Sequence, residues 1–115
     1  MPEHDTIEVT TGPDAQTVVV APQSDVDMSR SPSLRAAIRE AQAKRPGRLV
    51  VDLASVGYMD SSGLATLVEA MRVAKREGTE LVLCGMNDKV RAIFEIARLD
   101  QFFTIVGSVD DALVA

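Results

Sequence analysis

Short runs of β-branched and aliphatic residues alternate along this 115-residue chain with longer runs in which apolar residues recur every three or four positions. The short runs predict strands over residues 7–11, 17–21, 49–51, 81–84 and 103–106. The longer runs predict helices that begin near Ser31, Asp60, Asn87 and Ser108. Strands that alternate with helices build right-handed βαβ crossovers. We therefore expect an α/β fold with a mixed, mostly parallel sheet and about four helices.

Local signals add detail to this fold. Gly12-Pro13-Asp14 is a turn cluster between the first two strands and predicts an N-terminal antiparallel hairpin. Pro22 lacks an N–H donor, so we expect it to keep the second strand from being a well-paired central strand. Ser31-Pro32 predicts a capping serine followed by proline at the first helical position. Gly78 predicts the end of the second helix, because glycine adopts the left-handed conformation of a helix stop.

The length of the chain, with a mass of 12.3 kDa, allows one hydrophobic core. We expect a flexible N-terminal tail over residues 1–6 and a single domain over residues 7–115. The first residues carry no signal-peptide pattern, and the one cysteine, Cys84, has no partner for an internal disulfide, so we expect a cytoplasmic protein. The apolar runs are much shorter than the roughly 20 residues that span a bilayer, so we expect no membrane segment.

Charge and composition exclude nucleic acid as an expected partner. The net charge is −5, whereas binding to a phosphate backbone requires clustered lysine and arginine. Aromatic residues make up 3% of the chain and tryptophan is absent, which removes the usual platforms for stacked bases. The chain also lacks the glycine spacing and lysine of a phosphate-binding loop, so we expect no nucleotide cofactor.

Asp60-Ser61-Ser62-Gly63 stands where a strand is followed by a helix. The first turn of a helix has unpaired N–H groups and the positive end of the macrodipole, so Ser61 is placed to carry a phosphate. A purely structural interpretation is also open: Asp60 or a serine, with Ser62 a candidate, caps the helix, and Gly63 allows close packing. A nucleophilic serine would need a base, and the one histidine of the chain, His4, lies in the expected tail.

Two further groups are candidate chemical sites. Asp25 and Asp27 lie in a polar loop, where they could form an acid pair or hold a metal, but no histidine or cysteine supports them and such acids are usually solvated. We expect no metal. Cys84 ends an apolar strand, where a free cysteine behaves as a small buried hydrophobe. We therefore expect no catalytic residue in this chain.

Four segments taken together resemble the STAS domain of bacterial anti-sigma-factor antagonists. The order and spacing match over most of the chain, and the segments are Ser24-Asp25-Val26-Asp27, Leu49-Val50-Val51-Asp52-Leu53, Met59-Asp60-Ser61-Ser62-Gly63-Leu64 and residues 90–100. The resemblance implies a small mixed sheet packed with helices, no catalytic activity, and a cycle of serine phosphorylation. In that family the phosphoacceptor directly follows the aspartate, and here that residue is Ser61.

The resemblance also implies partners. An anti-sigma factor with serine kinase activity would bind the unphosphorylated form and so release a sigma factor, and a serine phosphatase would reset the switch. The implied contact surface is the start of the second helix, Asp60 to Gly63, with the loop of Asp25 and Asp27. The family loop usually reads Gly-Glu-(Leu/Ile)-Asp, so this chain departs from it at two positions. A STAS scaffold subunit in a stress-signalling or lipid-transport complex is the alternative. We expect a monomer or a weak dimer.

Overall fold

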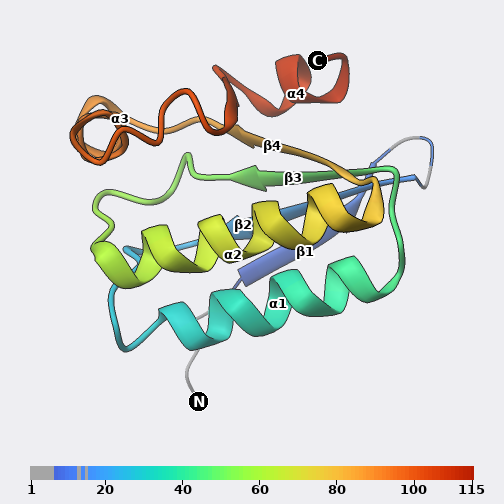
Figure 1. Ribbon diagram of the computed structural model, residues 1–115, viewed down its shortest axis with the longest axis horizontal. Coiled ribbons are helices and arrows are strands. Elements are labelled where there is room, and N and C mark those ends of the chain that lie inside the picture. Colours follow the sequence, from blue (N-terminus) through green and yellow to red (C-terminus); the bar gives the residue numbers. More distant parts are fainter. Residues whose placement is uncertain (1–6, 13, 15) are drawn as a thin grey trace.

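The computed structural model describes residues 7–12, 14 and 16–115 and contains a five-stranded mixed sheet (Figure 1). The strands lie in the order of the sequence and are β1 (Ile7–Thr11), β2 (Thr17–Pro22), β3 (Arg48–Asp52), β4 (Glu80–Cys84) and β5 (Thr104–Val106). β1 pairs antiparallel with β2, and the other three pairings are parallel. The predicted α/β class, with its N-terminal hairpin, is confirmed. The expected tail over residues 1–6, His4 and Pro13 of the hairpin turn lie outside the described residues.

Within the described part of the chain there are four helices: α1 (Ser31–Ala43), α2 (Ser61–Glu77), α3 (Asp88–Ile96) and α4 (Val109–Leu113). Figure 1 shows α1 and α2 running side by side along the sheet, with their first turns at the same end. None of the helices in this part is both long and apolar enough to cross a bilayer. α2 ends at Glu77 and is capped by Gly78, whose φ of 75° is left-handed, as the sequence predicts.

The apolar side chains form two cores, one on each face of the sheet. The larger core joins the sheet to α1, α2 and α3, and its fully buried members include Leu34, Leu49, Leu67 and Phe94. The smaller core lies under α4 and consists of Val19, Val50, Val82, Cys84 and Ala112. Burial raises the pKa of the Cys84 thiol to about 12, so this cysteine is a core residue and stays protonated at neutral pH, as predicted.

The sequence-based expectation for the second strand is wrong. β2 is paired on both sides, with β1 over its length and with β3 from Thr17 to Val20. Pro22 is the last residue of β2 and lies beyond the pairing with β3, so its missing N–H costs no hydrogen bond on that side. The strand is therefore a central one despite its proline.

The expected cap of the first helix is also corrected. Ser31 is the first residue inside α1, and Arg30 holds the cap position without a side-chain cap bond. Asp27 replaces a conventional cap: its carbonyl oxygen accepts from the N–H groups of Arg30 and Ser31, and its Oδ1 accepts from the N–H of Arg30. Asp27 thus satisfies the donors of the cap residue and of the first helical residue, three and four positions downstream of it.

The direction of the strands brings the candidate site residues together. Because β2, β3 and β4 run parallel, the loops that follow them meet at one edge of the sheet. The loop after β2 carries Asp25 and Asp27, the loop after β3 leads to Asp60 and Ser61, and the short loop after β4 ends at Asn87. Segments that lie far apart in the sequence therefore share one surface.

Candidate functional site

Ser61 is the first residue of α2, and its side chain is exposed. Asp60 caps this helix: its Oδ1 accepts from the N–H of Ser62 at 2.9 Å and from the N–H of Gly63 at 3.3 Å. The Ser62 hydroxyl also donates to this oxygen at 2.6 Å. The expectation that Ser62 caps the helix is therefore corrected, because its hydroxyl supports the aspartate. Among the described residues, no side chain holds the Ser61 hydroxyl.

The capping carboxylate is held in its ionised form. The hydroxyl of Ser62 lowers the pKa of Asp60, and the N–H groups of Ser62 and Gly63 act in the same direction. Desolvation and the nearby negative charge of Asp27 oppose this shift. The carboxylate therefore stabilises the helix end and leaves the neighbouring serine available.

Gly63 lies where the first turn of α2 meets the floor of the site. A Cβ at this position would come to 2.5 Å from Met59 Cγ and 3.0 Å from Val26 Cγ1. Both distances are shorter than normal carbon contacts, so a larger residue would push the helix away from the floor. This geometry supports the packing interpretation of the glycine.

The two predicted contact segments lie side by side. Val26 and Met59 form an isolated parallel bridge, in which the Val26 N–H donates to Tyr58 O at 3.0 Å and the Asp60 N–H donates to Val26 O at 3.1 Å. The Oδ1 atom of Asp25 accepts from the N–H groups of Gly57 and Tyr58. The acidic loop and the start of α2 thus form one connected platform.

Asp27, the second acid of the loop, accepts hydrogen bonds within its own turn. Asp27 Oδ1 accepts from the Ser29 hydroxyl at 2.7 Å and from the N–H groups of Ser29 and Arg30. The Ser29 hydroxyl in particular lowers the pKa of Asp27.

Within residues 7–12, 14 and 16–115, no group of three His, Cys, Asp or Glu side chains is arranged to hold a metal ion.

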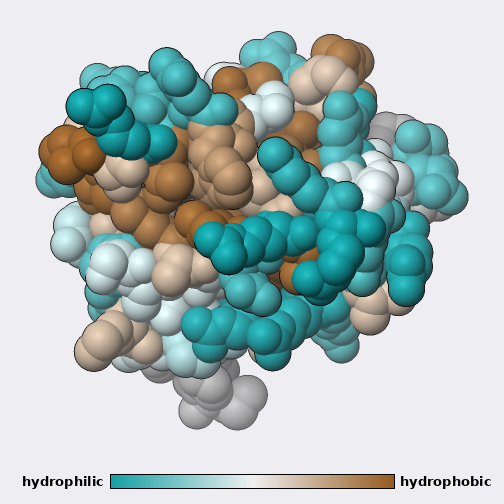
Figure 2. All heavy atoms as spheres, viewed as in Figure 1, coloured by the Kyte–Doolittle hydropathy of each residue, from teal (hydrophilic) through white to brown (hydrophobic). Residues whose placement is uncertain are grey.

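An apolar groove of roughly 400 Å³ opens beside Ser61, between the first turns of α2 and the end of α3. Figure 2 shows apolar side chains gathered on the left of the molecule, where Figure 1 places α3 and the start of α2. Tyr58 is 47% exposed and Ile96 is 83% exposed. The other lining residues are Met59, Asp60, Ser61, Leu64, Ile93 and Ala97. An apolar patch this open beside a polar site indicates a surface for another protein.

Sequence reasoning missed this groove. Ile96 lies off the apolar stripe of α3, which faces the core through Val90 and Phe94. In the sequence, an isoleucine away from the buried stripe of an amphipathic helix indicates an exposed apolar position. That this position borders a groove depends on α2 lying next to it, which the sequence pattern does not show.

Comparison with known proteins identifies the family of this chain. The sequence pattern of the STAS domain family matches residues 6–112. The chain belongs to the STAS domain family. The anti-sigma-B factor antagonist of Listeria monocytogenes is 35% identical to this STAS domain over 81 residues, which cover 70% of this chain and 71% of the relative.

Solved structures show the same fold. An anti-sigma factor antagonist from Mycobacterium paratuberculosis superposes on this STAS domain with a TM-score of 0.83 at 27% identity, covering 99% of this chain and 95% of the other. The antagonist SpoIIAA in its unphosphorylated form gives a TM-score of 0.80 at 19% identity, covering 94% and 93%. SpoIIAA of Bacillus in its phosphorylated form gives 0.73 at 18% identity, covering 94% and 96%. These two lower-identity matches show likeness of fold.

Proposed function

We propose that this STAS domain is an anti-sigma-factor antagonist that binds its partner around Ser61 and is switched by phosphorylation of that residue. The observation that carries the proposal is the exposed Ser61 hydroxyl, at the first position of a helix already capped by Asp60 and beside an open apolar groove. The partner surface consists of residues 60–63 and the groove, with the loop of Asp25 and Asp27 as its rim.

A phosphate on Ser61 is compatible with the free fold. It adds about −1.5 to −2 charges at neutral pH. The positive end of the α2 dipole favours an anion at this position by ~0.3 to 1 kcal/mol. Asp60 and Asp27 carry the same sign and oppose it, but the exposed side chain keeps the phosphate in water, which weakens that repulsion. The folded state therefore changes little on phosphorylation.

The same phosphate acts strongly in a complex. A partner that covers the groove also covers Ser61, and a dianion there would have to lose its water next to the Asp60 carboxylate. A net penalty of ~2.7 kcal/mol weakens binding about a hundredfold. Control by phosphorylation thus requires a change at the interface and no refolding of the domain.

In the proposed cycle, the partner proteins catalyse the phosphorylation and dephosphorylation of Ser61. An anti-sigma factor with serine kinase activity binds the unphosphorylated form, which frees a sigma factor for transcription. It transfers the γ-phosphoryl group of ATP to Ser61 Oγ and releases ADP and the hydroxyl proton. A serine phosphatase hydrolyses the phosphoester with water, which releases inorganic phosphate and restores the hydroxyl. The STAS domain itself is a binding module without a reaction of its own. We propose that it acts in the cytoplasm, where ATP and sigma factors are found, as a monomer or a weak dimer.

The test combines capture with site variants. Wild-type protein is used to capture binding proteins from cells of its source, which are identified by mass spectrometry, and the partner is then purified. Intact mass is measured after incubation with this partner and ATP. We expect one added phosphate on wild type and on the control Ser62→Ala, and none on Ser61→Ala.

Binding affinities complete the test. We expect Ser61→Ala to bind the partner as wild type does, and Ser61→Asp to bind about a hundredfold more weakly while remaining folded by circular dichroism. Equal affinities for Ser61→Asp and wild type would contradict the switch. If Ser61 also took up no phosphate, a constitutive scaffold role in a larger stress-signalling or lipid-transport assembly would replace the proposed switch.

A further inference from the structure

One oxygen of Asp25 joins two loops that are distant in the sequence. Its Oδ1 accepts from the N–H of Gly57 at 2.9 Å and from the N–H of Tyr58 at 3.1 Å, across 32 and 33 residues. Gly57 leaves just enough space for this contact, because a Cβ there would lie 3.1 Å from the same oxygen. The carboxylate therefore sits directly against the backbone of the loop before α2.

The same backbone segment is held from its other side by α3. The Nδ2 of Asn87 donates to Val56 O at 3.5 Å and to Gly57 O at 3.4 Å, while its Oδ1 caps α3 by accepting from the Val90 N–H at 2.7 Å. Residues 56–58 are thus fixed between the acidic loop and the start of α3. Only Met59 and Asp60 separate this segment from Ser61.

We propose that Asp25 is a positioning residue, a latch that fixes residues 56–58 and thereby sets how Tyr58 and Ser61 are presented to the partner. This inference rests on the proposed function, and it assigns Asp25 an indirect role in binding. Tyr58 and Ser61 both line the apolar groove, so a shift of the latched segment changes the shape of the surface that the partner meets.

The latch needs an acceptor oxygen and does not need a negative charge. An asparagine side chain has a carbonyl oxygen in the same place and can accept from both N–H groups, whereas alanine cannot. A carboxylate that instead paired with a basic group of the partner would lose that pair in either variant. Asp25→Asn and Asp25→Ala therefore separate the two roles.

The first arm of the experiment uses the free protein. Amide hydrogen exchange of Gly57 and Tyr58 is measured by NMR in wild type, Asp25→Asn and Asp25→Ala. We expect wild-type rates in the asparagine variant and rates about tenfold faster in the alanine variant. Asp27→Asn is the matched control, since it removes the same charge from the same loop but leaves the latch oxygen in place.

The second arm uses the captured partner. We expect affinity and the rate of Ser61 phosphorylation to stay within about threefold of wild type in Asp25→Asn and to fall about tenfold in Asp25→Ala. Equal losses in both variants, with unchanged exchange at Gly57 and Tyr58, would overturn the latch. If wild-type Ser61 takes up no phosphate, the proposed function fails. The exchange arm then decides alone: faster exchange in Asp25→Ala only supports the latch, and equal rates in all variants overturn it.

Discussion

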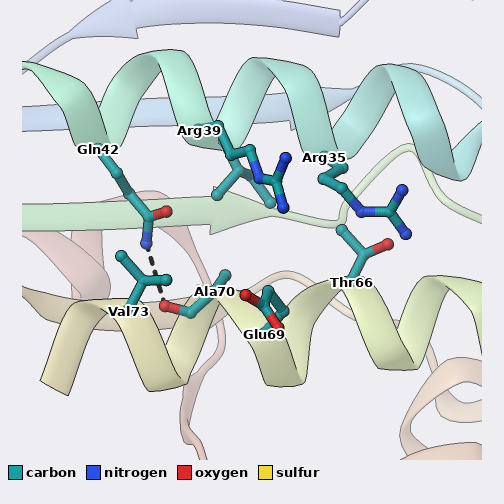
Figure 3. Close-up of a pocket in the computed structure, with 8 residues that line it drawn as sticks. Arg35, Arg39, Gln42, Thr66, Glu69, Ala70 and Val73 are labelled. Atoms are coloured by element: carbon teal, nitrogen blue, oxygen red, sulfur yellow. Dashed lines mark hydrogen bonds between the residues drawn. The ribbon is translucent and has the colours of Figure 1, made fainter. Parts of the chain in front are cut away.

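α2 lies between two neighbours, and its two sides differ. Toward α1 it forms a seam that contains a small pocket, where Gln42 is buried and donates from Nε2 to Ala70 O at 3.0 Å (Figure 3). Arg35 and Arg39 of α1 extend toward α2, and with Glu69 of α2 they line this pocket. Toward α3 the same helix leaves an open apolar groove with Ile96 at its rim.

The difference shows which side of α2 is complete without a partner. The seam satisfies its two buried polar side chains, Gln42 and Thr66, internally and has long charged side chains along its opening. The groove keeps apolar area in water because α3 has only nine residues and ends beside the first turns of α2. Leaving such a surface exposed costs free energy, which a bound protein recovers.

Crowding the floor of the open side should have the largest effect. Gly63→Val places a Cβ 2.5 Å from Met59 Cγ and adds two methyl groups next to Val26. We expect the free energy of unfolding to fall by roughly 3 kcal/mol, measured by urea denaturation. Gly47→Val is the matched control, because the nearest atom to a Cβ there is 3.7 Å away. Equal losses in both variants would show that the packing below the site is loose.

Changing the rim of the groove should affect binding and spare the fold. Ile96→Asp removes an 83% exposed side chain, so we expect its unfolding free energy to stay within about 0.5 kcal/mol of wild type. Burial of an isoleucine is worth ~1.5 to 3 kcal/mol, so partner affinity should fall about tenfold to a hundredfold. Unchanged affinity, measured by titration calorimetry, would remove the groove from the interface.

The seam between α1 and α2 should give the opposite pattern and serves as the control. Gln42→Leu keeps a similar volume but removes the hydrogen bond to Ala70. We expect a loss of roughly 1 kcal/mol in unfolding free energy and an unchanged partner affinity. A change in affinity here would mean that both sides of α2 take part in binding.

Local patterns in the sequence predicted most of the fold, because each element depends on its own residues. The repeat of Val90 and Phe94 on one side of α3, the stop at Gly78 and the cap position of Asn87 are all local signals, and the structure contains them. Pro22 misled the prediction because its effect depends on where the pairing of β3 with β2 ends. That register is a property of two strands together.

The candidate site was predictable in position and less so in detail. The segment from Asp60 to Gly63 could be predicted as a site because it stands at the start of a predicted helix. The contact of Asp25 with Gly57 and the groove below Ile96 arise from segments about 30 or more residues apart. No local pattern records such contacts, since they follow from parallel strands that bring three loops to one edge.

The smallest expected effect is a difference in how unfolding free energy depends on pH for variants on the two sides of α2. The Ser62 hydroxyl lowers the pKa of Asp60 below its ordinary 3.8, so the ionised cap stabilises the fold above that pH, and this contribution is lost as pH falls through the lowered value. Asn at this position accepts the same N–H groups at every pH. The stability advantage of wild type over Asp60→Asn should therefore shrink below about pH 4 in urea denaturation. The difference caused by Gln42→Leu should stay constant over the same range, because Gln42 does not titrate. A constant Asp60 difference would mean that charge contributes nothing at this helix end.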